Sequence, residues 1–343
     1  MSLARAITTG DLAELPSRRD EGWRWSDLRG LVRAVPSAAP AHVGELPLGS
    51  FAAVDAEIVE VVNGRGSTPI DVAPGEVRCI ALRYLAADAG AQASSISVQV
   101  GAGASLILLE SHEGAAGAVA EADLEIVLER GARLERVVLA DEADDAVSVI
   151  HADVTLTPEA AYAQTVITSG AKRQRIETRV RHGGGGANAR LDGLYLVTGR
   201  RHADITTVVV HEGPDGSTDQ LTKGVATDQG RGVFQGRIEV APGADRTDAK
   251  MGHHALVLSD HAEVDAKPEL EIYADDVACS HGNTVGALDE EALFYARQRG
   301  IPEAEARAML TEAFVGAVVD RIEHGAAREI VRAWVAERTA IFK

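Results

Sequence analysis

The chain has 343 residues, of which 45% are hydrophobic, 25% charged and only 4% aromatic, a composition that fits a soluble folded protein. Asp and Glu outnumber Lys and Arg by 52 to 34, and the formal charge of −18, with no basic stripe, argues against nucleic acid and anionic membranes as partners. No apolar run approaches the ~20 residues that a membrane helix needs.

The first region, residues 1–69, is predicted to be a helical arm followed by a linker and a few early strands. A helix is expected near Asp11–Leu15, and a short tryptophan-containing segment follows at Trp23–Leu28. Three prolines between residues 36 and 47 then interrupt regular structure. The first five residues lack the apolar stretch of a signal peptide, which favours a cytoplasmic location.

The second region, residues 70–285, is predicted to consist of short strands separated by Gly, Asp and Ala. A small-residue turn followed by an apolar run recurs along it, with successive spacings of 28, 28, 28 and 27 residues over the first five marks. The expected strands include Ser105–Glu110, Asp123–Leu128, Leu134–Leu139, Val147–Leu156 and Ile205–His211. The marks are Gly75-Glu76, Gly103-Ala104, Gly131-Ala132, Glu159-Ala160, Gly186-Ala187, Asp215-Gly216 and Gly243-Ala244.

This period favours a parallel β-helix with two or three strands in each coil. Stacked at about 4.8 Å, seven or eight coils would form a rod of roughly 35–40 Å, with aliphatic residues inside and Gly or Asp at the corners. Both ends of such a rod must be capped or paired. A β-sandwich is the alternative, but its turn signals usually recur every 8–12 residues.

The third region, residues 286–343, is predicted to be helical. Asp289 is a plausible N-cap for a helix over Glu290–Arg299, and Pro302 opens a second helix that Gly325 is expected to end. A last helix carries an apolar stripe that includes Trp334. The apolar faces of these helices must pack on the rod or on a partner.

Cys279 and His281 form the first candidate site. Residues i and i+2 of a strand point to the same face, so the thiol and the imidazole are expected side by side. These groups suit zinc and iron–sulfur species, but two ligands cannot close a four-coordinate site without help from elsewhere. The alternative is a buried cysteine beside a turn histidine. Cys79 and Cys279 lie outside any CxxC pattern and are expected to be free thiols.

Other polar clusters are weaker candidates for a metal or ligand site. His202 and Asp204 would share a strand face and, with His211, could form the facial triad of a metal-dependent oxygenase, although such residues are more often solvated or hydrogen-bonded. His253 and His254, followed by His261, are expected at the surface. The run of four glycines at 183–186 precedes a strand rather than a helix, so a turn is expected there instead of a phosphate site.

The sequence from Val233 to the C-terminus resembles the SufB/SufD family of iron–sulfur cluster assembly proteins, and its SufD branch best. Weaker matches upstream are His211-Glu212, Lys223-Gly224 and the tryptophan segment. The matching residues are Phe234-Gln235-Gly236-Arg237-Ile238, Thr247-Asp248-Ala249, Lys267-Pro268-Glu269-Leu270-Glu271-Ile272, Asp275 to Gly282, Thr284-Val285-Gly286, Leu288-Asp289 and Leu293-Phe294-Tyr295-Ala296-Arg297.

The resemblance implies a right-handed parallel β-helix with helical ends, acting as a scaffold without catalytic activity of its own. It implies a complex with SufB-like and SufC-like proteins, in which the last β-helix coils meet SufB and the C-terminal helices dock the SufC ATPase. Candidate docking residues are Phe294, Arg297, Arg299, Met309, Leu310 and Phe314.

Cys279 and His281 occupy the family positions at the SufB interface, and Gly282 stands where SufB-like sequences tend to carry Glu. No stably bound cofactor is expected in the isolated chain; iron or a nascent cluster would be held transiently with SufB, and ATP would act through SufC. Exposed edges also make a homodimer reasonable when SufB is absent. A secreted pectate-lyase-type enzyme is the alternative, although neither an export signal nor a carboxylate cluster for calcium is visible.

Overall fold

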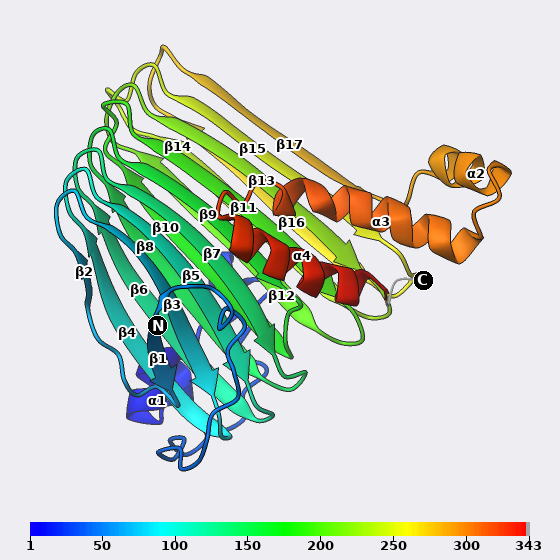
Figure 1. The fold of residues 1–343 in the computed structure, drawn as a ribbon, viewed down its shortest axis with the longest axis horizontal. Helices are drawn as coiled ribbons and strands as arrows, with labels where there is room; N and C mark the ends of the chain where they lie inside the picture. Colours follow the sequence, from blue (N-terminus) through cyan, green and yellow to red (C-terminus); the bar gives the residue numbers. More distant parts are fainter. Residues whose placement is uncertain (341–343) are drawn as a thin grey trace.

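The computed structural model describes residues 1–340 and shows a flattened parallel β-helix (Figure 1). Its strands alternate between a nine-stranded sheet of odd-numbered strands and an eight-stranded sheet of even-numbered strands, called the odd and even sheets below. All strand pairs within the two sheets are parallel, so the predicted solenoid is confirmed, with two long strands in each coil. The strands are β1 (Glu57–Val62), β2 (Ile70–Val72), β3 (Val77–Ala86), β4 (Gly90–Val100), β5 (Ser105–Gly114), β6 (Ala118–Leu128), β7 (Arg133–Glu142), β8 (Val147–Leu156), β9 (Ala161–Thr168), β10 (Arg173–His182), β11 (Asn188–Val197), β12 (His202–His211), β13 (Ser217–Ala226), β14 (Arg231–Val240), β15 (Asp248–Val257), β16 (Glu263–Ile272) and β17 (Ala278–Gly286).

The predicted turn marks are corners of the coil. The first residue of each of the seven marked pairs has a left-handed backbone, with φ between 60° and 83°. Glycine adopts this conformation without steric cost, and Glu159 and Asp215 take it where no glycine is present. The 28-residue repeat appears in the register, where Val77 pairs with Ser105 and Ser105 with Arg133. The glycines at 183–186 form the turn between β10 and β11.

Aliphatic side chains on the inward faces of both sheets fill the β-helix, as the alternating pattern predicts. The interior also holds a fully buried ion pair, in which Nε of Arg136 donates to Oε2 of Glu110 at 2.6 Å. Although burial opposes ionisation, Arg136 and His112 hold the pKa of Glu110 at about 2. The core is therefore layered and mostly aliphatic, with the Arg136–Glu110 ion pair inside it.

The N-terminal arm lies on the outer face of the even sheet. It contains α1 (Leu3–Thr9) and two 3₁₀ turns, η1 (Leu12–Glu14) and η2 (Glu21–Trp23). The helix predicted near Asp11–Leu15 is only the single turn η1, because Pro16 follows at once and the chain is extended at Leu15. α1 had no counterpart among the predicted elements.

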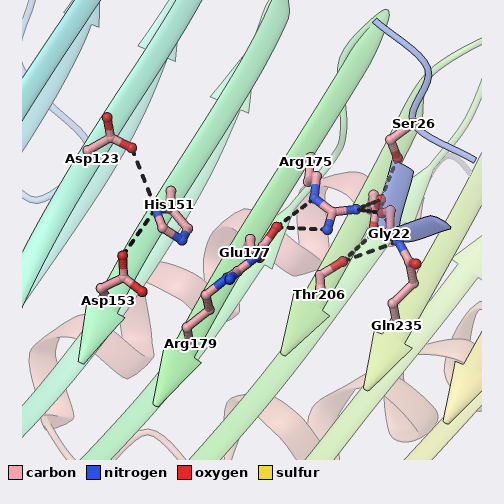
Figure 2. A network of polar contacts seen from close by, with 11 residues as sticks. Gly22, Ser26, Asp123, His151, Asp153, Arg175, Glu177, Arg179, Thr206 and Gln235 are labelled. Atoms are coloured by element: carbon pink, nitrogen blue, oxygen red, sulfur yellow. Dashed lines mark hydrogen bonds and ion pairs between the residues drawn. The ribbon is translucent and has the colours of Figure 1, made fainter. Parts of the chain in front are cut away.

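A buried polar network fixes the arm to the sheet (Figure 2). Nη1 of Arg175 donates to the Gly22 carbonyl at 2.6 Å and to Oδ2 of Asp204 at 2.9 Å. The Ser26 hydroxyl donates to the same Asp204 carboxylate. The Trp23 ring lies over the Arg175 guanidinium, 4.5 Å from its central carbon. Residues 22–26 are therefore held by charge-assisted hydrogen bonds as well as by the packing of the Trp23 ring.

The C-terminal region forms α2 (Glu290–Gln298), α3 (Glu303–Val319) and α4 (Gly325–Thr339). Asp289 caps α2 as predicted, accepting from the Glu291 amide at 2.9 Å. α3 and α4 lie on the outer face of the odd sheet, whereas α2 stands away from the β-helix (Figure 1). The apolar helix residues packed there are Leu310, Phe314, Val315, Val318, Val319, Ala327, Ile330, Val331, Trp334 and Val335.

The prediction that Gly325 ends the second helix was wrong. α3 ends at Val319, and Gly325 is the first residue of α4, capped by His324. The connection is held on the odd sheet, where Arg321 pairs with Asp192 at 2.9 Å and Glu135 accepts from the His324 amide. These tertiary contacts set the helix boundary, which local propensity could not reveal. Within residues 1–340, no helix has both the length and the apolar character needed to cross a membrane.

Candidate functional site

The β-helix is open at its C-terminal end, where β16 and β17 are the last strands of the two sheets. β16 pairs only with β14, and β17 pairs only with β15. The outer edge of each strand therefore presents backbone N–H and C=O groups with no strand partner in the described part of the chain. Such an edge is a template for pairing with another chain.

Cys279 and His281 belong to the inward-facing row of β17. In the parallel register Cys279 lies beside Ala249 and His281 beside Met251, and both β15 partners are buried side chains of the core. Because paired residues of neighbouring parallel strands face the same way, the side chains of Cys279 and His281 point toward the axis of the coil, at its open end. Asn283 and Val285 continue this row, and the same alternation would have identified them from the sequence.

The open end exposes apolar surface around this row. Ile272 is 42% exposed, Tyr273 60% and Val285 46%, although Leu270 and Ala274 nearby pack against the core. These residues would be covered if another coil were stacked on the end. The exposed apolar side chains and the unpaired strand edges together indicate an interaction surface.

The Cys279 thiol is half-buried, and His281 is exposed. Burial raises the pKa of the Cys279 thiol, so the protonated form dominates at neutral pH. No group of three or more His, Cys, Asp and Glu side chains within residues 1–340 is arranged to hold a metal ion. The pair therefore offers one sulfur and one nitrogen donor, about 6.6 Å apart along the strand, that need further ligands from another chain.

The six predicted docking residues of the helical region fall into two groups. Phe294 and Met309 are 62% and 51% exposed, and Arg297 and Arg299 are exposed as well. Leu310 and Phe314 instead pack toward the odd sheet, and Lys223 donates to the Phe314 carbonyl at 2.7 Å. The first group is open to a partner, while the second attaches the helices to the β-helix.

A groove lies between α3 and α4 beside Met309. Its walls include Val315 and Val319 from α3 and Val335 from α4, with Arg332 at the margin, and its volume is about 350 Å³. The exposed Met309 side chain of α3 therefore borders a hollow rather than a flat surface.

The oxygenase interpretation of His202, Asp204 and His211 is wrong. His202 and His211 stand at opposite ends of β12, roughly 30 Å apart at about 3.3 Å per residue. Nε2 of His202 lies 3.0 Å from the Trp25 carbonyl, whereas His211 stacks on His182 at 4.4 Å. Asp204 lies in the arm network.

The prediction that His253 lies at the surface is also wrong. It is fully buried, because it points inward on β15 together with Met251 and Ala255, which lie two residues to either side on the same strand face. His254 faces outward and lies 2.7 Å from the Thr284 hydroxyl, and His261 is exposed in the turn that follows.

Fold and site together define a β-helical protein with an open interaction end and a helical surface beside it. Comparison with known proteins identifies the family. Residues 83–314 match the family described as SUF system FeS cluster assembly, SufBD core domain. The chain belongs to the SufBD family of iron–sulfur cluster assembly proteins, on its SufD branch, and its role lies in iron–sulfur cluster assembly.

Curated relatives agree with this assignment. Iron–sulfur cluster assembly protein SufD of Escherichia coli (strain K12) is 35% identical over 208 residues, which cover 60% of this chain and 49% of that protein. The SufBD family protein ML0594 of Mycobacterium leprae is 29% identical over 351 residues, covering 93% and 89%. SufD of Bacillus subtilis is 33% identical over 138 residues. The match thus spans about half the length of the Escherichia coli protein but most of the Mycobacterium leprae protein.

Proposed function

We propose that this chain is a non-catalytic, SufD-like subunit of a cytoplasmic assembly complex, and that it pairs with a SufB-like protein through β16 and β17. The observation that carries the proposal is the open end, where unpaired strand edges and exposed apolar side chains surround Cys279 and His281. A second β-helix end would pair with these edges and cover the apolar rim in one step.

The chemistry at the interface follows from the two side chains. Sulfur and imidazole donors suit iron and iron–sulfur species, which are cargo of the assembly reaction, and the SufB-like chain would supply the remaining ligands. Because the pKa of Cys279 is raised in the isolated chain, metal binding must displace its proton. No cluster is therefore expected to stay on the chain alone.

We further propose that the helical region docks a SufC-like ATPase through the exposed side chains of α2 and α3. Phe294 and Met309 supply apolar contacts there, and Arg297 and Arg299 supply charge. α3 is anchored to the odd sheet through Phe314, so a movement imposed on α3 would be passed to the strands. ATP would act on this chain only through that partner.

The test is reconstitution of a complex from this chain, a SufB-like protein and a SufC-like protein of the same organism. A stable complex is expected, and His281→Ala should lower cluster yield while leaving folding and complex formation intact. Ser280→Ala is the matched control, since Ser280 is a neighbour on β17 that faces the opposite way. Normal cluster yield from the His281 variant would remove this residue from the mechanism, and failure to bind a SufB-like chain would refute the proposed pairing.

Size measurement of the isolated chain tests whether a second copy of the chain, rather than a SufB-like protein, binds at the open end. We expect self-association through the same edges at high concentration, and a SufB-like chain should displace it. A homodimer that resists a SufB-like chain would show that the open end is reserved for a second copy.

A further inference from the structure

His253 lies one strand below the open end, directly under β17. In the register it is beside Asn283, the residue that follows His281 in the inward row. Its ring stacks flat on Phe234, with 4.7 Å between centroids and 2° between planes. A buried polar ring at this place needs partners for both of its nitrogens.

Both nitrogens have partners. Nδ1 of His253 lies 2.7 Å from Oδ1 of Asn283, and Nε2 lies 3.0 Å from the Tyr195 hydroxyl. Burial lowers the pKa of His253 to about 4, so the ring is neutral at pH 7 and carries one proton. An amide oxygen only accepts, which makes Nδ1 the donor to Asn283 and Nε2 the acceptor from Tyr195.

Tyr195 reaches His253 only because glycines leave room for its ring. A Cβ atom at Gly224 would lie 1.9 Å from the tyrosine ring, and one at Gly232 would lie 2.2 Å from it. Tyr195 itself is fully buried. The hydroxyl that meets Nε2 of His253 is therefore held in place by the core of the β-helix.

β17 is an edge strand that pairs with β15 on one side, so a side-chain bond to β15 adds to the backbone pairing that fixes its register. A slip of one residue would turn Cys279 and His281 to the opposite face. Within the described residues, the Asn283 side chain makes the hydrogen bond that ties the inward row of β17 to the coil beneath it. The Thr284 contact with His254 lies on the other face.

We propose that His253 is a positioning residue for the Cys279–His281 pair, because it locks β17 in the register that turns both side chains toward the open end. The role of the pair in assembly rests on the proposed function. The anchoring of β17 is a property of the isolated chain and is tested there.

Two substitutions separate the two ring contacts. In His253→Asn the side-chain amide nitrogen takes the place of Nδ1 and keeps the donor to Asn283. In His253→Gln the amide nitrogen takes the place of Nε2, so the Asn283 contact is lost. Both variants lose the stacked ring, and each keeps the ring contact that the other loses, so a third variant is needed to assign a difference to the bond with β17. Asn283→Ala removes the same bond from an exposed position and spares the core.

The measurements are amide hydrogen exchange across residues 278–286 and the rate of Cys279 alkylation in a Cys79→Ser background. We expect His253→Gln and Asn283→Ala to raise both rates about fivefold, the size of one net hydrogen bond, and His253→Asn to stay near the starting rates. Equal rates in the Gln and Asn variants, or unchanged exchange in Asn283→Ala, would overturn the inference.

Cluster yield with the partner chains completes the test. Asn283→Ala should lower the yield, and His253→Asn should retain more of it than His253→Gln. Faster exchange with full cluster yield in Asn283→Ala would reduce His253 to a purely structural residue. A wild-type chain that supports no cluster formation would instead refute the proposed function, while the exchange and alkylation rates would still decide whether His253 anchors β17.

Discussion

Lowering the pH is predicted to stabilise the folded chain where the N-terminal arm covers the even sheet. Glu121 on β6 is buried beneath the arm, and its carboxylate accepts from the Ala4 amide at 2.6 Å. Burial, with repulsion from Asp123, raises the pKa of Glu121 to about 7 from a usual 4.5. The folded state therefore binds more protons than the unfolded chain between these values. The stability that Glu121 contributes is greatest below pH 4.5 and is lost as the pH rises through 7.

The magnitude follows from the two pKa values. At about 1.36 kcal/mol for each tenfold change, the limiting effect of Glu121 is roughly 3.4 kcal/mol, of which roughly 2.5 kcal/mol falls between pH 5 and pH 8. His151 contributes in the same direction. Burial opposes its charge, but Asp123 and Asp153 raise its pKa, so its favourable contacts are also lost as the pH rises above the histidine range.

The assay uses the tryptophans of the arm. Trp23 and Trp25 are two of the three tryptophans in the chain, so a Trp334→Phe background makes fluorescence report on the arm. Urea titrations at pH 5 and pH 8 would compare this background with Glu121→Gln, which cannot ionise. The stability difference between the two proteins should change by about 2.5 kcal/mol across this range. A constant difference, or one that favours the ionisable protein at high pH, would refute the reasoning.

Two further predictions concern the core of the β-helix. Arg136→Met leaves the Glu110 charge buried without its main partner. The variant should lower the free energy of unfolding by about 3–5 kcal/mol, measured by urea titration. A neutral effect would show that Glu110 is protonated in the variant. Gly224→Ala places a methyl group against the buried Tyr195 ring and should destabilise the chain by about 1–3 kcal/mol, measured by thermal unfolding. Gly282→Ala is the control, because a Cβ atom there has no atom within 4 Å, and its stability should be unchanged. Equal melting temperatures for the two glycine variants would contradict this packing.

The repeat was predictable because every coil has the same geometric requirement. A left-handed corner residue is needed where one strand passes to the next, and this need places Gly75, Gly103 and Gly131 at equal spacing. The facing of Cys279 and His281 was likewise predictable, since strand alternation depends only on position along the chain.

Contacts between distant segments were not predictable in this way. The arm is held by Arg175 and Asp204, which lie about 150 and 180 residues beyond it, and no local pattern marks them as its partners. The burial of His253 was missed because the whole histidine-rich stretch was expected at the surface. The alternation of Met251, His253 and Ala255 on one strand would have placed it inside.

The coils grow longer toward the open end while the strands do not. Arg231 pairs with Glu263, 32 residues later, although β14 and β16 each have ten residues, as does β3 near the start. The added residues lie in the corners at 241–247 and 258–262, which leaves a rim of loops outside the strand ends. A partner built from short 28-residue coils would leave that rim bare, whereas one with equally long corners would cover it. In the proposed pairing, β-helical partners would therefore be distinguished by their perimeter as well as by the side chains that meet across the strands.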